Sequence, residues 1–262
     1  MTVTTETQAI GATRAAEASP RPRFFTWRRF ATPIVVVVVL ALLLLWVSTL
    51  QLDSIEQRTL NWTYITLRVG EHLSLTVVAS ALVAVLAIPT GILLAKTRSA
   101  TARNVILAIA NIGQATPAVG VVILLAILWQ TGYTTALVAL VVYAFLPVLR
   151  NTMIGIQQVD ANVRESARGM GMTPNQVLTR IEVPLAVPVI LAGLRTALVF
   201  CVGVATIATF INAGGLGDMI VNGLKLQRYP VLVVGAVLVA CIALLIDWIA
   251  GFAEDLLKPK GI

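Results

Sequence analysis

Apolar residues in this chain form long uninterrupted blocks, not the alternating stripes of a water-soluble helix or strand. Most of these blocks approach the roughly 20 residues that a helix needs to cross a bilayer. There are six of them, over residues 33–50, 72–95, 105–129, 135–149, 185–211 and 230–250. The pattern therefore predicts an all-α membrane protein with about six transmembrane helices.

The segments outside these blocks define the remaining organisation of the chain. Residues 1–32 are rich in Thr, Ala, Glu and Arg and have no apolar period, which predicts a disordered cytoplasmic tail. The basic end of this tail and the apolar run after it resemble a signal peptide, but the run is long and lacks a small-residue cleavage site. We therefore expect a retained first helix over residues 33–50, followed by an extracytoplasmic segment, 51–71. A core of spanning helices, 72–252, and a cytoplasmic tail, 253–262, complete the chain.

Composition excludes a water-soluble fold and changes how the charge is interpreted. Charged residues make up 12% of the chain, whereas a soluble domain carries about 25%. The net charge of +7 comes from short basic clusters between apolar blocks, without a continuous basic face, so nucleic acid is not an expected partner. Cys201 and Cys241 lie inside apolar blocks and are interpreted as small buried hydrophobic residues.

The basic residues predict the orientation of the chain in the membrane. If the N-terminus is cytoplasmic, fourteen of the nineteen lysines and arginines fall in cytoplasmic segments and four in outer segments, while Arg195 lies within a span. This is the bias of the positive-inside rule. We therefore expect a multi-pass protein of the plasma or inner membrane, with both termini and the polar segment 160–184 in the cytoplasm.

The polar segment 160–184 has the signals of two short helices joined by a turn. Asn162 and Glu165 fit a capping box for the first helix, and Gly169 and Gly171 supply the turn. The second helix has an N-cap, a proline in its first turn and a glutamine three residues after the cap, at Thr173, Pro174 and Gln176. Pro184 then delimits it. A plain connector is the alternative, but a connector needs no well-capped helices.

Motifs of nucleotide and metal chemistry are absent from the sequence. It contains no G-x-x-x-x-G-K-[ST] loop, so any ATP hydrolysis belongs to another subunit. It also contains no H-E-x-x-H, C-x-x-C or G-x-S-x-G pattern. The single histidine, His72, is interpreted as a polar residue at a helix boundary. We expect no catalytic residue, no metal site and no cofactor bound by this chain.

Two ionisable residues lie within the apolar blocks. Arg195 is about ten residues into its block, and Asp247 lies near the cytoplasmic end of the last one. Charges inside a membrane usually face a bundle interior or move toward the interface. We favour a structural ion pair between these two side chains over a role in substrate binding.

A polar interruption marks the third apolar block. The sequence Asn-Ile-Gly-Gln-Ala-Thr-Pro over residues 111–117 breaks the block and frees backbone groups that only a wet or protein-lined cavity tolerates. Gln114, Thr116 and Pro117 are therefore candidates for lining a translocation path. A packing kink between helices explains the same pattern equally well.

A glycine-rich segment follows the fifth block on the outer side. Ala213 to Gly217, followed by Asp218, predicts a short helix with a flexible entry and Asp218 as its cap. Such an element suits an outer gate or a contact with a binding protein. The candidate residues are Gly214, Gly215, Gly217 and Asp218, with plain interfacial packing as the alternative.

The cytoplasmic segment also resembles a known signature. Glu165, Ala167, Gly171, Ile181 and Pro184 match the loop of permease subunits of binding-protein-dependent ABC importers, which is Glu-Ala-Ala, three residues, Gly, nine residues, Ile-x-Leu-Pro. Ser166 and Val183 are mild departures. The resemblance implies a type I importer permease, whose coupling helix docks on an ATP-hydrolysing subunit. The implied coupling residues are Glu165, Ser166, Ala167, Gly169, Gly171, Ile181 and Pro184.

Three further runs resemble one branch of that family. Residues 143–152, 183–196 and 214–218 are similar to permeases that import osmoprotectants such as glycine betaine, carnitine, choline and proline betaine. The resemblance spans residues 72–262. It implies a cytoplasmic ATP-binding subunit, a second permease subunit, identical or homologous, and an extracytoplasmic solute-binding protein as partners in the bilayer.

Three other interpretations remain open at the level of sequence. An importer of another small solute, such as an amino acid, shares the coupling signature. An ion-coupled secondary transporter would carry ion-binding carboxylates inside its spans, for which Asp247 alone is thin support. A membrane anchor or assembly factor would show no solute uptake phenotype.

Overall fold

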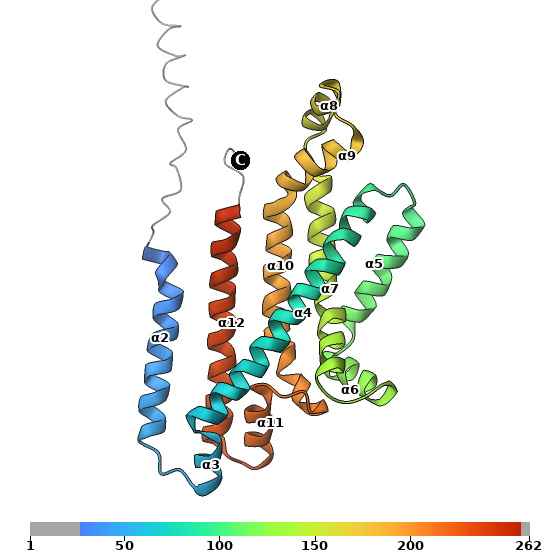
Figure 1. Cartoon of the computed structure of the whole chain (residues 1–262). Coiled ribbons are helices and arrows are strands. Elements are labelled where there is room, and N and C mark those ends of the chain that lie inside the picture. Colours follow the sequence, from blue (N-terminus) through green and yellow to red (C-terminus); the bar gives the residue numbers. More distant parts are fainter. Residues whose placement is uncertain (1–26, 258–262) are drawn as a thin grey trace, which may run out of the picture.

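The computed structural model describes residues 27–257, and all the regular elements in this range are helices (Figure 1). The expected tail, 1–32, lies largely outside the described residues, as do residues 258–262. In chain order the elements are α2 (Trp27–Ser48), α3 (Ser54–Thr59), α4 (Trp62–Lys96), α5 (Ala100–Ala115), α6 (Ala118–Leu128), α7 (Tyr133–Gln157), α8 (Ala161–Gly169), α9 (Pro174–Val177), the π-helical turn η1 (Leu178–Glu182), α10 (Val183–Ala205), the 3-10 turn η2 (Ile207–Ile211), α11 (Gly217–Lys225) and α12 (Tyr229–Leu257).

Five helical stretches in the described range are long and apolar enough to cross a membrane. They are α2, α4, α7, the run from α9 through α10, and α12. The pair α5 and α6 adds a sixth if its two helices count as one broken span. The structure thus confirms an all-α protein with five to six transmembrane helices.

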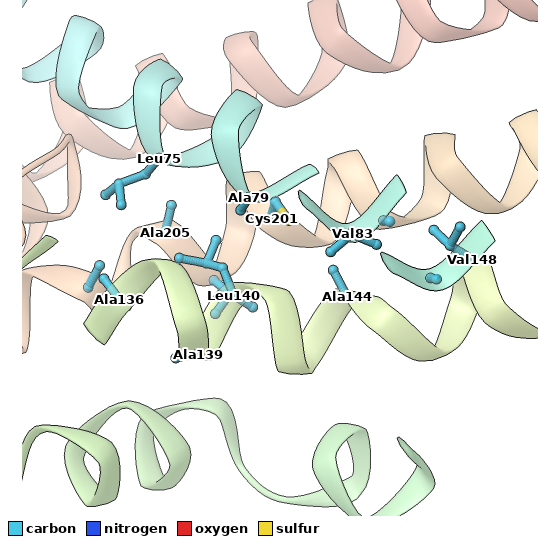
Figure 2. Close-up of a cluster of buried hydrophobic side chains, with 14 of the residues drawn as sticks. Leu75, Ala79, Val83, Ala136, Ala139, Leu140, Ala144, Val148, Cys201 and Ala205 are labelled. Atoms are coloured by element: carbon cyan, nitrogen blue, oxygen red, sulfur yellow. The ribbon is translucent and has the colours of Figure 1, made fainter. Parts of the chain in front are cut away.

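Helices α4, α7 and α10 pack together as the central core of the bundle. Figure 2 shows small residues where these helices meet, with Ala79 of α4 beside Cys201 of α10 and Ala144 of α7 facing Val83 of α4. Small side chains are what membrane helices use to approach each other, because lipid supplies no hydrophobic driving force between helices. Both cysteines are buried and free, as expected.

The remaining spanning helices surround this core. Helix α12 packs on α10 and α11, and α2 packs on α12 at the edge of the bundle (Figure 1). Most apolar side chains of α2 are exposed, with Val36 as the buried exception. A helix with exposed apolar side chains of this kind is suited to contact with the lipid hydrocarbon chains of a membrane.

Several helices are longer than the apolar blocks that predicted them. Helix α4 begins at Trp62, capped by Asn61, so His72 is a fully buried residue inside the helix and the expectation of a boundary residue is wrong. Helix α2 begins at Trp27 and α7 continues to Gln157. Hydropathy ends a span at the first polar residues, whereas a helix continues wherever those side chains find partners or reach the interface.

The third apolar block is not one straight span. Its two helices, α5 and α6, meet at Thr116 and Pro117 with a bend of 100°. Thr116 has an extended backbone, and its hydroxyl donates to the Ile112 carbonyl (2.7 Å). Pro117 has no N–H to continue the α5 hydrogen bonds, so the helix ends here and a new one starts.

Candidate coupling hairpin and outer polar network

Helix α8 and helix α9 form a hairpin that projects beyond one end of the bundle (Figure 1). The Trp27 end of α2 and the Leu257 end of α12 point the same way. Asp160 caps α8 by accepting from the Asn162 N–H (2.8 Å), so the expected Asn162–Glu165 capping box is wrong. The helix begins at Ala161, so Asn162 lies inside it and is not in the cap position. We call α8, α9 and the turn between them the coupling hairpin.

The start of the second hairpin helix is the predicted one. The Thr173 hydroxyl accepts from the Gln176 N–H (3.4 Å), and the Gln176 side chain accepts from the Thr173 N–H (2.8 Å), which is a complete capping box. Pro174 occupies the first turn. The helix does not stop at Pro184, because η1 continues directly into α10, with Pro184 in the first turn of α10.

The turn of the coupling hairpin depends on the backbone of Gly171. Its φ is +85°, and the N–H groups of Gly171 and Met172 donate to the carbonyls of Arg168 (2.9 Å) and Ala167 (3.2 Å). This is a Schellman motif, which needs a left-handed residue after the helix. A Cβ at Gly171 would meet no atom of the chain. The glycine is therefore required here for its conformation.

The structure divides the candidate coupling residues into an exposed and an inward group. Glu165, Ser166, Gly169 and Gly171 are exposed. Ala167 is buried, and Ile181 and Pro184 are half-buried on η1 and α10. Sequence reasoning missed Met170, which is 71% exposed between the two glycines and is the most prominent apolar side chain of the hairpin.

A buried carboxylate lies at the base of the coupling hairpin. Glu182 is 0% exposed, and its carboxylate accepts from Lys96 Nζ at the end of α4 (2.5 Å from Oε1). Arg164 of α8 lies 4.0 Å from the same carboxylate. Sequence reasoning missed Glu182, because the family signature leaves its position, between Ile181 and Val183, unspecified.

Arg195 and Asp247 meet between α10 and α12. Arg195 Nε and one terminal nitrogen each donate to an Asp247 carboxylate oxygen at 2.6 Å, a bidentate arrangement. Glu254, about two turns further along α12, is 3.9 Å from the guanidinium. The structure therefore brings this predicted pair together.

The three path candidates lie at the break between α5 and α6. Gln114 and Thr116 are half-buried and Pro117 is exposed. Alongside α5 and α7 runs an apolar cavity of about 340 Å³, with Gly113 and Phe145 among its lining residues. A polar contact between α5 and α7 is made by Arg150, which donates to the Asn111 side chain (2.6 Å).

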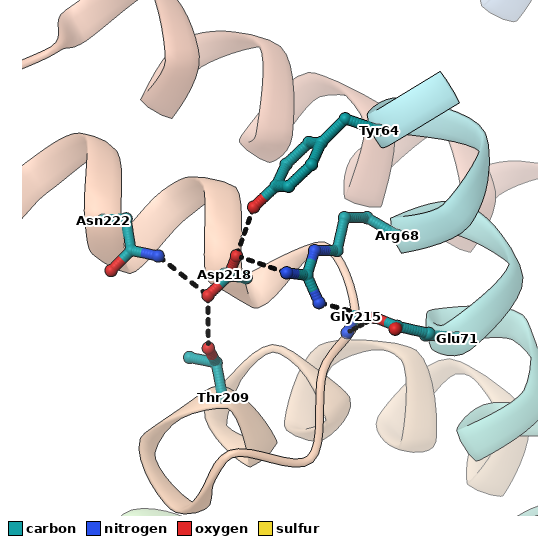
Figure 3. Close-up of polar contacts among 7 residues, drawn as sticks. All are labelled: Tyr64, Arg68, Glu71, Thr209, Gly215, Asp218 and Asn222. Carbon is teal, nitrogen blue, oxygen red and sulfur yellow. Dashed lines mark hydrogen bonds and ion pairs between the residues drawn. The ribbon is translucent and has the colours of Figure 1, made fainter. Parts of the chain in front are cut away.

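At the other end of the bundle, Asp218 gathers four polar side chains (Figure 3). Tyr64 donates to it, Arg68 pairs with it at 3.1 Å, Asn222 donates at 2.8 Å and Thr209 lies at 3.5 Å. The expected role of Asp218 as helix cap is wrong. Leu216 is the N-cap of α11, and the Asp218 carboxylate turns toward α4 because Arg68 is there.

The glycine-rich segment is held against α4 by the same set of residues. Arg68 pairs with Glu71 (2.9 Å), and Glu71 accepts from the Gly215 N–H (2.8 Å). Gly214 and Gly215 have φ of +80° and +89°, which favours glycine. A Cβ at Gly217 would lie 1.9 Å from the Thr206 carbonyl oxygen, so this position accepts no side chain without a backbone shift. We call Tyr64, Arg68, Glu71, Gly215 and Asp218 the outer polar network.

Within residues 27–257, no three His, Cys, Asp or Glu side chains lie together in a way that could hold a metal ion. The ion pairs and hydrogen bonds described above tie η1, at the base of the coupling hairpin, to α4 at one end of the bundle and the glycine-rich segment to α4 at the other.

Comparison with known proteins places these features in context. Residues 87–259 match the model of the family described as binding-protein-dependent transport system inner membrane component. The carnitine transport permease protein OpuCB of Listeria monocytogenes is 41% identical over 73% of this chain and 87% of its own length. The choline transport system permease protein OpuBB of Bacillus subtilis is also 41% identical, over 73% of this chain and 88% of its own.

Two more comparisons extend the similarity. The osmoprotectant import permease protein OsmY of Salmonella typhimurium is 34% identical over 86% of this chain and 94% of its own length. Among solved structures, an inward-facing conformation of the MetNI methionine ABC transporter has a chain that superposes with a TM-score of 0.66. That chain is 24% identical, and the match covers 75% of this chain and 97% of the other, which supports the fold alone.

Proposed function

Since the chain belongs to the family of binding-protein-dependent transport system inner membrane components, we propose that it is the permease subunit of an ATP-driven importer of osmoprotectants. The expected solutes are small quaternary ammonium compounds such as glycine betaine, carnitine and choline. The observation that carries this proposal is the identity of 38–41% to permeases named for carnitine, choline and glycine betaine, over 73–74% of the chain.

The coupling hairpin is the proposed contact with a cytoplasmic ATP-binding subunit. It presents Glu165, Ser166, Gly169, Met170 and Gly171 to solvent at the end of the bundle. The sequence has no phosphate-binding loop of its own, so ATP is bound and hydrolysed by the partner. The chain itself performs translocation without chemistry.

The outer polar network marks the opposite face, where an extracytoplasmic solute-binding protein delivers its cargo. Gly214, Gly215, Gly217 and Asp218 would then form part of an outer gate. A second permease subunit, identical or homologous, completes a path in which Gln114, Thr116 and Pro117 take part. Both termini and the coupling hairpin lie in the cytoplasm, in line with the lysine and arginine distribution.

Uptake of labelled solutes tests this proposal. Cells lacking the gene should lose most of their high-affinity import of at least one of radiolabelled glycine betaine, carnitine and choline, and a plasmid copy should restore it. Unchanged import of all three, together with loss of uptake of an amino acid, would favour the importer of another small solute instead.

A further inference from the structure

The carboxylate of Glu182 joins three elements that are far apart in the sequence. It belongs to η1, its closest partner Lys96 ends α4, and Arg164 belongs to α8. A fully buried carboxylate is costly to desolvate and is tolerated only while its cationic partners stay close. The three elements are therefore held together at one point by charge.

This point coincides with a change of helix type. Between the coupling hairpin and α10 lies the π-helical turn η1, in which the Val183 N–H donates to the Leu178 carbonyl five residues before it. Short π-helical segments are rare and often mark functional sites. If η1 had no contact with another helix, a displacement of the hairpin would deform η1 and would not reach the rest of the bundle. The ion pair between Glu182 of η1 and Lys96 of α4 provides such a contact.

Helix α4 leads from this attachment to the outer polar network. It is one helix from Trp62 to Lys96. Arg68 and Lys96 are 28 residues apart, which is about 42 Å at 1.5 Å per residue. Arg68 is tied to Asp218 and Glu71, and through Glu71 to the Gly215 backbone. The same helix is thus fixed at one end by an ion pair to Glu182, at the base of the coupling hairpin, and at the other end by ion pairs and a hydrogen bond to the glycine-rich segment and α11.

We propose that Glu182 is a positioning residue that fastens the coupling hairpin to α4 through Lys96. When the ATP-binding subunit displaces the hairpin, α4 moves with it, and its far end shifts the outer polar network. Lys96 is 39% exposed beside a cavity of about 520 Å³, so its side of the pair has room to move. This inference rests on the proposed function. It assigns the coupling between the ATP-binding subunit and the outer polar network to the ion pair between Lys96 and Glu182.

The test measures solute imported per ATP hydrolysed in the complete complex, purified by a tag on this chain and reconstituted in vesicles. The probe is whichever of labelled glycine betaine, carnitine or choline the wild-type complex imports. The key variant is Lys96→Met/Glu182→Met, because replacing both partners of a buried pair by apolar residues often preserves stability. We expect its import per ATP to fall at least tenfold, with the ATP-binding subunit still co-purifying.

Two matched variants show whether the effect is specific. Lys96→Arg keeps the ion pair and should keep import per ATP within twofold of wild type. Arg195→Met/Asp247→Met removes another interhelical ion pair in the same way, but one that contacts neither the hairpin nor α4. It should also stay within twofold. Charge reversal is unsuitable, because a lysine at position 182 would face Arg164.

Each other outcome decides the question. Wild-type import per ATP in Lys96→Met/Glu182→Met would overturn the proposal, and so would loss of the ATP-binding subunit from that complex, because the pair would then serve docking. If this double variant is not recovered from the membrane, Glu182→Gln, which keeps the shape, carries the test, and an unchanged ratio refutes it. A wild-type preparation without any ATP-binding subunit would instead refute the proposed function.

Discussion

At the scale of single residues, two glycines serve different physical needs. Gly171 has a left-handed backbone and open space where a Cβ would be, whereas the backbone of Gly217 lies against the Thr206 carbonyl. At Gly171 the backbone conformation disfavours a side chain, and at Gly217 the lack of space does. Substitution by alanine tests the two effects separately.

Gly171→Ala should cost about 1–2 kcal/mol of local hairpin stability, the usual penalty for a left-handed non-glycine residue. Gly217→Ala should cost more, about 3 kcal/mol, the upper end of the usual cost of overpacking, because a backbone atom cannot move aside as a side chain does. Thermal unfolding of the purified chain in detergent measures the global loss for Gly217→Ala. Proteolysis rates in the hairpin measure the local loss for Gly171→Ala.

The control for both glycines is Gly203→Ala, since Gly203 lies in α10 with ordinary φ and nothing near its Cβ position. This change should leave stability unchanged or raise it slightly. Equal losses at Gly203 and Gly217 would show that the close approach to Thr206 is not limiting.

In the outer polar network, the carboxylate of Asp218 should matter more than that of Glu71. Asp218→Asn removes the charge that balances Arg68 and should destabilise the protein by about 1–3 kcal/mol. Glu71→Gln retains an oxygen that can accept from the Gly215 N–H, so its cost should be smaller. Chemical unfolding of both variants gives the order, and a larger loss for Glu71→Gln would contradict it.

At the scale of elements, the coupling hairpin offers a sharp test of docking. Met170→Asp places a charge on an exposed apolar side chain, so the stability of the free chain should not change, while an apolar docking contact would be lost. We expect at least tenfold less ATP-binding subunit to co-purify, about 1.4 kcal/mol or more. Asn162→Asp, an exposed change in the first turn of α8, is the control. Equal recovery of the subunit in both variants would place the docking surface elsewhere.

Local chemistry made some elements predictable from sequence, although the cap expected at Asn162 was wrong. The capping box at Thr173 and Gln176 and the glycine turn depend on neighbours within a few residues, and both are present. The extent of α4 was not predictable, because its first turns contain Arg68 and Glu71, whose partners Asp218 and Gly215 lie some 150 residues away. The cap assigned to Asp218 failed for the same reason.

At the scale of the whole molecule, the charge distribution makes a prediction about topology. Both native cysteines are buried, so single cysteines can be introduced after Cys201→Ala and Cys241→Ala. Glu165→Cys on the coupling hairpin should react with a membrane-impermeant maleimide only in inside-out vesicles. Arg58→Cys on α3 should react in intact cells. The opposite labelling of the two sites would invert the topology.

Family and fold class could be predicted from the sequence, because hydropathy and the loop signature are both local in the chain. Only some of the ion pairs that connect the helices could be predicted in this way. Arg195 and Asp247 were the conspicuous charges of apolar blocks, and the structure places them in contact. Lys96 and Glu182 looked like ordinary polar residues outside the spans, and only the packing of η1 against the end of α4 reveals their pairing.

The self-contained hydrogen bonding of the coupling hairpin has a consequence for biogenesis. The caps at Asp160 and Thr173 and the turn at Gly171 are all closed by residues between 160 and 176, without help from another subunit. Helix and turn formation takes microseconds, whereas a ribosome adds about 5–20 residues per second. We therefore expect the caps and the turn to form before α12 is synthesised, so that the proposed docking surface needs no further folding when an ATP-binding subunit arrives.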